Sequence, residues 1–183
     1  MTKYIKKSTL YLDMDGVLAD FNSAARTLLK ATVAEERLAQ NNGRWSHEKW
    51  RKIAGNKHFY RNLPKTPIAD RLVDMAMQFK QIGWDVKVLT AIPKGNDMPD
   101  VFHDKIDWIN EYYPGLRVHF GPYSDDKHLH CRENDILIDD RTSNCNEWRL
   151  AGGIAIQVLD SRQESALQEL SALFQETLTF SFV

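Results

Sequence analysis

Residues 9–22 of this chain read TLYLDMDGVLADFN, an apolar run followed at once by two carboxylates. The apolar run at 10–12 has the length and composition of a buried strand, and it stops at Asp13. Asp15 and Gly16 follow, and the glycine lets the backbone turn sharply and lets a ligand approach closely. Polar residues just beyond the carboxyl end of a strand are where open α/β sheets bind their ligands.

A second apolar run, far along the chain, also stops at paired carboxylates. Residues 134–141 read NDILIDDR, so Asp139 and Asp140 end a run that is hydrophobic enough for the centre of a parallel sheet. If the two strands are neighbours, both pairs of carboxylates gather at one edge of the sheet. Acids this close repel one another unless a cation or a shared proton intervenes. Hard oxygen ligands favour Mg²⁺, so the sequence predicts a magnesium site at this edge.

The order of these motifs resembles that of the HAD-type phosphatases. DMDGV at 13–17 is similar to the first motif, Thr90 at the end of an apolar run to the second, Lys127 to the third, and the Asp139-Asp140 pair to the fourth. The longer strings at 13–21 and 137–141 are most similar to those of the 5'(3')-deoxyribonucleotidases. The resemblance implies a HAD-like core and a Mg²⁺-dependent enzyme that removes phosphate from nucleoside monophosphates.

The resemblance also implies a role for each motif residue. Asp13 is the expected nucleophile, which forms an aspartyl-phosphate, and Asp15 is the expected general acid and base. Mg²⁺ is expected on the Asp13 carboxylate, on the Asp15 backbone carbonyl and on Asp140, with Asp139 behind them. The residues expected to hold the phosphoryl oxygens are Thr90, Ala91 and Lys127, the last of which lies in a segment that reads as a charged loop.

The alternation of apolar runs and helical patterns predicts an α/β fold. Strands and helices that alternate with short connections favour a doubly wound, mostly parallel sheet with helices on both faces. The length of 183 residues fits one domain. We expect a core formed by residues 1–19 and 64–183, with a small helical cap inserted as segment 20–63.

Local patterns predict where individual helices lie. Apolar residues three and four apart predict one helical stretch over 18–40. Thr66 is expected to cap the next helix, and a later helix is expected over 99–113. The stripe that this later helix is expected to bury is Phe102, Ile106, Ile109 and Tyr113. A last helix is expected over 161–178, and residues 177–183 are compatible with an edge strand or a tail.

Segment 20–63 is rich in aromatic and basic side chains. Such aromatics either fill the interior of a small cap or form a wall on which a nucleobase stacks, which is worth about 1–3 kcal/mol per base. The residues expected to contact the substrate are Phe21, Trp45, Phe59 and, from a later loop, Lys94. For Lys94 the plain alternative is a solvated loop lysine.

Charge and cysteine content limit the range of partners and compartments. The chain has 24 Lys and Arg against 25 Asp and Glu, so it has no long-range attraction for polynucleotides or anionic membranes. Two cysteines outside any Cys-x-x-Cys pattern, and an N-terminus without an apolar leader, predict a reduced cytoplasmic protein without a membrane span. The sequence leaves a homodimer open.

Three alternative functions are compatible with the same motifs. The first is a phosphatase for another small phosphomonoester. The second is a phosphatase for polynucleotide ends, which the near-zero net charge disfavours. The third is a non-catalytic nucleotide-binding module, which the presence of both Asp13 and Asp15 disfavours. The preferred base and sugar, and the choice between 5' and 3' phosphate, do not follow from the sequence.

Overall fold

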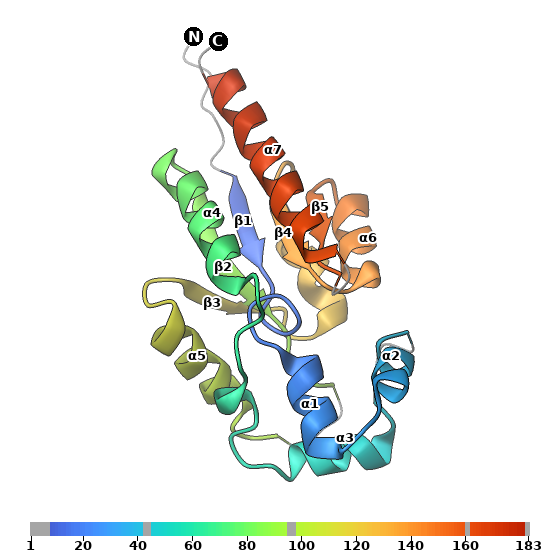
Figure 1. The fold of residues 1–183 in the computed structure, drawn as a ribbon. Helices are drawn as coiled ribbons and strands as arrows, with labels where there is room; N and C mark the ends of the chain where they lie inside the picture. Colours follow the sequence, from blue (N-terminus) through green and yellow to red (C-terminus); the bar gives the residue numbers. More distant parts are fainter. Residues whose placement is uncertain (1–7, 42–44, 95–97, 160–161, 182–183) are drawn as a thin grey trace.

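A five-stranded parallel sheet forms the centre of the molecule (Figure 1). The computed structural model describes residues 8–41, 45–94, 98–159 and 162–181. The strands lie in the order β3-β2-β1-β4-β5, and every pair among them is parallel, which confirms the expected α/β fold. They are β1 (Thr9–Leu12), β2 (Asp85–Thr90), β3 (Arg117–Phe120), β4 (Ile136–Asp139) and β5 (Ile154–Gln157).

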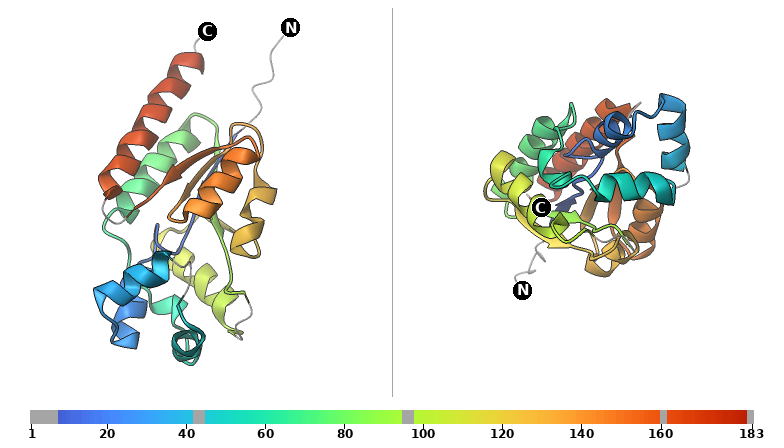
Figure 2. Two further views of the ribbon diagram at one scale, coloured as in Figure 1. Left: turned by 90° about the vertical axis from the view of Figure 1, so that its right-hand side faces the viewer. Right: turned by 90° about the horizontal axis from the view of Figure 1, so that it is seen from below.

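Helices lie on both faces of the sheet (Figure 2). Helices α4 (Ala69–Gln81) and α7 (Gln163–Ser181) pack together on one face. On the other face α6 (Thr142–Leu150) packs against the 3₁₀ helix η2 (Ser124–His130). Within the described ranges, no helix combines the length and the apolar character needed to cross a membrane.

Each face of the sheet has its own apolar core, because successive side chains of a strand point to opposite faces. Leu10 and Leu12 of β1 belong to the core that also contains Leu72 of α4. Tyr11, between them, belongs to the opposite core, where its ring lies edge-on to that of Trp148 at a centroid distance of 5.4 Å. The short apolar run at 10–12 is buried on both sides for this reason.

The register of the strands places the charged ends of β1 and β4 side by side. Leu12 pairs with Ile138, so Asp13 and Asp139 are the next pair along the two chains. The Asp13 amide donates to the carbonyl of Ile138 at 2.9 Å, which ties the end of β1 to β4. Thr90 ends β2 on the other side of β1. The candidate residues of the first, second and fourth motifs therefore share one edge of the sheet.

Segment 20–63 lies beyond the carboxyl ends of the strands (Figure 1). Its helices are α1 (Phe21–Leu29), α2 (Val33–Asn41), α3 (His47–Ala54) and the 3₁₀ helix η1 (Tyr60–Asn62). The chain enters and leaves this segment through a short antiparallel neck, residues 18–20 and 64–66. In the neck the Asp20 amide donates to the Pro64 carbonyl and the Thr66 amide donates to the Leu18 carbonyl, each at 2.8 Å.

The prediction of one helical stretch over 18–40 is wrong. Residues 14–19 form a tight turn instead, in which the Ala19 amide donates to the Met14 carbonyl at 2.8 Å. Helix α1 begins only at Phe21, and Lys30 ends it in the left-handed conformation with φ of 49°. The apolar spacing does not reveal these breaks because the residues of the turn are themselves buried in the core.

Two predictions at helix ends are also wrong. Thr66 does not cap α4, which begins at Ala69; its hydroxyl donates to the Val17 carbonyl at 2.6 Å and so holds the turn that follows β1. Residues 177–181 continue α7 rather than forming an edge strand, and residues 182–183 lie outside the described ranges.

Helix α5 (Val101–Tyr112) buries only part of the predicted stripe: Ile109, and Tyr113 just after the helix, are buried as predicted. Phe102 and Ile106 are 39% and 36% exposed, although both were expected to face inward. The buried positions of α5 are Val101, Asp104, Lys105, Trp108 and Ile109. Their spacing is that of one helix face, but two of them are charged, and charged residues are rarely buried unless they are paired. The charge partners of this face lie in other elements and are described below.

Trp108 joins α5 to the end of segment 20–63. Its indole Nε1 donates to the carbonyl of Leu63 at 2.7 Å, and both residues are buried. We predict that Trp108→Phe lowers the free energy of unfolding by about 1–3 kcal/mol, because the buried carbonyl loses its donor. Urea unfolding measures the change. Trp84→Phe is the control, since the Trp84 ring packs on Phe79; an equal loss in both variants would contradict a specific role for this hydrogen bond.

Candidate active site

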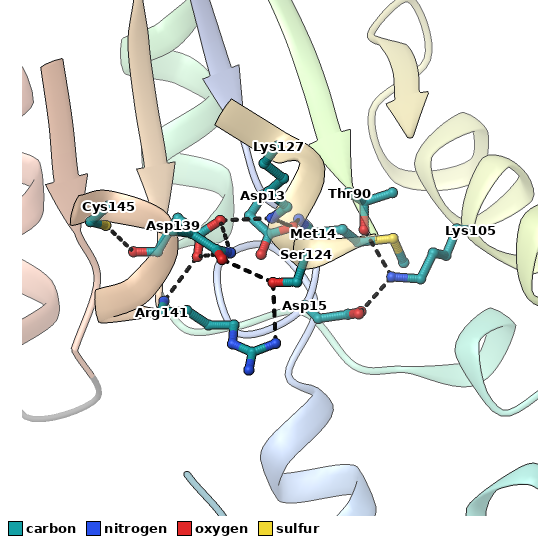
Figure 3. Close-up of polar contacts among 11 residues, drawn as sticks. Asp13, Met14, Asp15, Thr90, Lys105, Ser124, Lys127, Asp139, Arg141 and Cys145 are labelled. Carbon is teal, nitrogen blue, oxygen red and sulfur yellow. Dashed lines mark hydrogen bonds and ion pairs between the residues drawn. The ribbon is translucent and has the colours of Figure 1, made fainter. Parts of the chain in front are cut away.

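Three carboxylates meet where β1 and β4 end, and two of them, Asp13 and Asp139, are labelled in Figure 3. One oxygen from each of Asp13, Asp139 and Asp140 lies within 4.8 Å of the others, and we call this group the acidic centre. Asp13 is 4% exposed and Asp139 is fully buried. The structure therefore brings together the two acidic strand ends that the sequence placed at one edge. The carboxylate of Asp15 lies outside this group.

The side chain of Lys127 reaches into the acidic centre from η2, not from a loop. Its Nζ lies 2.8 Å from Asp13 Oδ1 and 2.6 Å from Asp139 Oδ2, and the side chain is 2% exposed. Burial alone lowers the pKa of this ammonium, but Asp13 and Asp139 outweigh burial and raise the pKa. Lys127 is consequently charged in the folded protein.

Asp139 and Asp140 differ in what surrounds their carboxylates. The oxygens of Asp139 accept hydrogen bonds from Lys127, from the Arg141 amide at 2.9 Å and from Asn144 Nδ2 at 3.0 Å. The Arg141 amide and Asn144 hold the Asp139 carboxylate in place, and the carboxylate in turn holds Lys127. Asp140 lines the open cleft above the sheet edge, and Asp139 does not. Asp140 is thus the member of the pair that can reach a bound ligand.

Gly16 makes room for Asp140. Its φ is +80°, and a Cβ added there would lie 2.5 Å from Asp140 Oδ2. Both the backbone conformation and the close approach therefore require glycine at this position. The sequence indicated a sharp turn and a close approach at Gly16, and the group that approaches it is the Asp140 carboxylate of the acidic centre.

The electrostatics of the acidic centre fit a divalent cation. Burial raises the pKa of Asp13 to about 7, with Lys127 acting against this shift and Asp139 reinforcing it. Burial, reinforced by Asp139 and Asp13 and opposed by Lys127, raises the pKa of Asp140 well above its usual range. Three carboxylates face one ammonium here, so negative charge is in excess. Oxygen donors in this arrangement suit Mg²⁺, which would remove the cost of keeping the acids ionised.

Asp15 is paired with a residue that the sequence patterns did not reveal. Its Oδ2 accepts from Lys105 Nζ at 2.5 Å, and the same ammonium donates to Thr90 Oγ1 at 2.8 Å (Figure 3). Lys105 belongs to the buried face of α5 and is fully buried. Lys105 could have been found from the spacing of Val101, Asp104, Lys105 and Trp108. These positions share one face of a helix, and two charged residues lie among the apolar ones.

The residues expected to bind phosphate lie near the contact between Asp15 and Lys105 and near the acidic centre. Thr90 is fully buried, with its hydroxyl directed to Lys105. Ala91, the next residue, lines the cleft beside Lys127. A phosphoryl group above the acidic centre would meet the Lys127 ammonium and the backbone at Ala91, and Thr90 would act from just behind this surface.

A cleft of about 1620 Å³ opens from the acidic centre toward segment 20–63. Typical sites for small molecules measure about 300–1,000 Å³, so the cleft has room for a nucleoside monophosphate. The aromatic residues that line it are Phe21, Trp45, Trp50, Tyr60 and Tyr123. Lys94 and Arg141 line the side that belongs to the core, and Lys94 lies 3.3 Å from Asp125.

The structure brings three of the four predicted substrate contacts to this cleft. Phe21, Trp45 and Lys94 line it, but Phe59 does not. The Phe59 ring lies edge-on behind Phe21, at a centroid distance of 5.7 Å, and lines a separate pocket of about 420 Å³. Tyr60, the next residue, stacks on Phe21 and faces the cleft instead.

The sequence of this chain matches a known protein family. Residues 7–168 match the family described as 5' nucleotidase, deoxy (pyrimidine), cytosolic type C protein (NT5C). The chain belongs to this family. As a member of the 5' nucleotidase family it is a phosphatase of the 5'-nucleotidase type, which confirms the resemblance and the enzyme class inferred from its motifs.

The solved structures with the same fold include dehalogenases. L-2-haloacid dehalogenase from Xanthobacter autotrophicus superposes with a TM-score of 0.51 at 15% identity, over 91% of this chain and 83% of the dehalogenase. A second structure, described as a dehalogenase, gives a TM-score of 0.58 at 15% identity, over 92% of this chain and 97% of the other. At this identity the likeness shows the HAD-like fold alone. No curated protein matched the chain.

We predict that Gly16→Ala destabilises the protein by about 1–3 kcal/mol, because it combines a positive φ with a clash against Asp140. Thermal unfolding measures the loss. Gly115→Ala is the matched control, since Gly115 has φ of +99° with no heavy atom within 4 Å of an added Cβ. In an Asp140→Ala background the loss at Gly16 should fall to that of the control; an undiminished loss would refute the clash.

Proposed function

We propose that this member of the 5' nucleotidase family is a Mg²⁺-dependent phosphatase of nucleoside monophosphates that works through an aspartyl-phosphate on Asp13. One observation carries the proposal: Asp13, Asp139 and Asp140 meet around the buried ammonium of Lys127 at the end of an aromatic-lined cleft. Phosphoryl transfer needs this combination, because its transition state spreads negative charge over oxygens that must be shielded from the attacking carboxylate.

The metal ligands in this proposal are the Asp13 and Asp140 carboxylates and the backbone carbonyl of Asp15. Asp139 stays behind them and orients Lys127, which is supported by the three donors to its carboxylate: Lys127 itself, the Arg141 amide and Asn144 Nδ2. Mg²⁺ bound there supplies positive charge that lets a phosphoryl group approach the acidic centre.

In the first half of the reaction, Asp13 attacks phosphorus. The bond between phosphorus and the nucleoside oxygen breaks, and Asp15 gives its proton to that oxygen, so the nucleoside leaves as a neutral alcohol. Lys127 and the backbone at Ala91 stabilise the phosphoryl oxygens, and Thr90 supports them from behind. The product of this half is the nucleoside and an aspartyl-phosphate on Asp13.

In the second half, water attacks the phosphoryl group. Asp15 takes a proton from the water, the bond between Asp13 and phosphorus breaks, and inorganic phosphate leaves. Asp13 is again a carboxylate and Asp15 again carries the proton for the next cycle. Asp15 lines the cleft, as this exchange with water requires.

Segment 20–63 is the substrate-selecting cap in this proposal. The nucleoside extends from the acidic centre into the cleft, which is lined by the aromatic residues Phe21, Trp45, Trp50 and Tyr60. Lys94 and Arg141 add positive charge on the opposite side. The description of the family as cytosolic supports a cytoplasmic location. A homodimer stays a prediction.

We predict that the protein releases inorganic phosphate from nucleoside monophosphates only with Mg²⁺. Excess EDTA should abolish the activity and added Mg²⁺ should restore it, because the acidic centre repels the phosphoryl group without a cation. A phosphate-release assay over a panel of deoxyribonucleotides and ribonucleotides measures this and defines the preferred base and sugar. Asp13→Asn, which lacks the nucleophile, is the inactive control. Full activity in excess EDTA would sink the metal assignment.

We predict that Trp45→Ala raises KM for nucleoside monophosphates about 10- to 100-fold, equivalent to losing one base-stacking contact. KM for p-nitrophenyl phosphate, which has no base, should change much less. The Trp45 side chain is 5% exposed, so the melting temperature must be measured alongside both KM values. Equal losses on both substrates, together with a lower melting temperature, would show that Trp45 only fills the interior of segment 20–63.

A further inference from the structure

Lys105 carries a buried charge to which the reaction as proposed assigns no role. Its ammonium is enclosed by three parts of the chain: Asp15 after β1, Thr90 at the end of β2, and Tyr60 in η1. The distances are 2.5 Å to Asp15 Oδ2, 2.8 Å to Thr90 Oγ1 and 4.7 Å to the centroid of the Tyr60 ring. Of these residues Asp15 and Tyr60 line the cleft, so the ammonium lies directly behind the wall of the site.

The two buried lysines divide the carboxylates of the site between them. Lys127 contacts Asp13 and Asp139, whereas Lys105 contacts Asp15. A buried ammonium is costly unless a carboxylate compensates it, and a carboxylate close to other acids is costly unless a cation compensates it. Each lysine therefore has a different task, and that of Lys105 concerns Asp15 alone among the four aspartates.

Lys105 determines which way Asp15 points. Figure 3 shows the Asp15 side chain directed toward Lys105 and away from Asp139. Repulsion by the acidic centre and attraction by Lys105 favour the same direction. Because the ammonium also bonds to Thr90, it holds Asp15 at a set place beside the proposed phosphoryl site, instead of leaving the carboxylate free to rotate.

Helix α5 is itself anchored on both sides of Lys105. Asp104 accepts from His58 Nδ1 at 2.8 Å, and Trp108 donates to the Leu63 carbonyl at 2.7 Å. Both partners belong to segment 20–63. A side chain held in this way is preorganised, because its own position is fixed by neighbours that do not take part in the reaction.

We propose that Lys105 is a positioning residue, which orients Asp15 so that its proton reaches the departing nucleoside oxygen. The inference rests on the proposed function, in which Asp15 is the general acid. Lys105 touches no reacting atom in this role; it acts through Asp15. Removing its charge should therefore harm the reaction only where the leaving oxygen needs a proton.

The test compares two leaving groups in the Lys105→Met variant. Met has a similar unbranched shape and fills the same space without the charge. The parameter kcat/KM reports the steps through departure of the leaving group. For a nucleoside monophosphate we expect it to fall about 10- to 100-fold, part of what a general acid contributes. For p-nitrophenyl phosphate, whose leaving group departs without a proton, we expect a change of less than about 3-fold.

A second measurement separates positioning from direct phosphate binding. The inhibition constant of inorganic phosphate should stay within about 2-fold of wild type in Lys105→Met, because a residue that acts through Asp15 adds nothing to ground-state phosphate binding. A strong rise in this constant would make Lys105 a phosphate ligand and overturn the proposal. Lys65→Met is the matched control, since Lys65 also pairs with an aspartate, Asp70, and lies over aromatic rings, but does not line the cleft.

A double-mutant cycle decides whether the effect passes through Asp15. In an Asp15→Asn background, Lys105→Met should lower nucleotide turnover by less than about 2-fold further. Additive losses, or equal losses of kcat/KM on both substrates, would refute positioning. If Lys105→Met does not fold, as its melting curve will show, Lys105→Gln takes the same measurements. Wild-type protein without activity on any nucleoside monophosphate would instead refute the proposed function.

Discussion

The ammonium of Lys127 is the contact on which the site depends. A parallel sheet that sets β1 beside β4 brings Asp13 next to Asp139, and buried carboxylates at that spacing repel one another. Lys127 offsets this repulsion from η2, on a separate element, at 2.8 Å and 2.6 Å. The strand order thus sets two acidic strand ends side by side. This arrangement is stable only because a third element, η2, supplies a buried cation there.

Helix α5 connects the candidate active site with segment 20–63. Its buried face touches Asp15 through Lys105 and contacts segment 20–63 through Asp104 and Trp108. Asp15, the proposed general acid, and segment 20–63 are therefore both attached to the same helix. In the proposed function, selection of the nucleoside and protonation of its oxygen concern these two parts of the molecule, and α5 contacts both.

Features that depend on neighbouring residues could be predicted from the sequence. Features that depend on contacts between residues far apart in the chain could not. The short apolar runs that stop at Asp13 and at Asp139 predict two buried strands and an acidic sheet edge, and each run spans only a few residues. Lys105 escaped notice because its partner Asp15 is 90 positions away, and a buried charge resembles a solvated one in any periodic pattern. Phe59 was expected at the substrate because of its position in the resembled family's cap, whereas the turn of η1, which directs Phe59 and Tyr60 to different pockets, cannot be read from the sequence.

The neck at 18–20 and 64–66 has a consequence for how this architecture can vary. Both connections to segment 20–63 are hydrogen-bonded to each other, so the ends of the excursion are already joined before its helices begin. The entropy of closing such an excursion grows only slowly with its length. Insertions or deletions between the two neck strands would therefore add little to the entropic cost of closing the excursion. The length of segment 20–63 is in this way only weakly constrained by chain entropy.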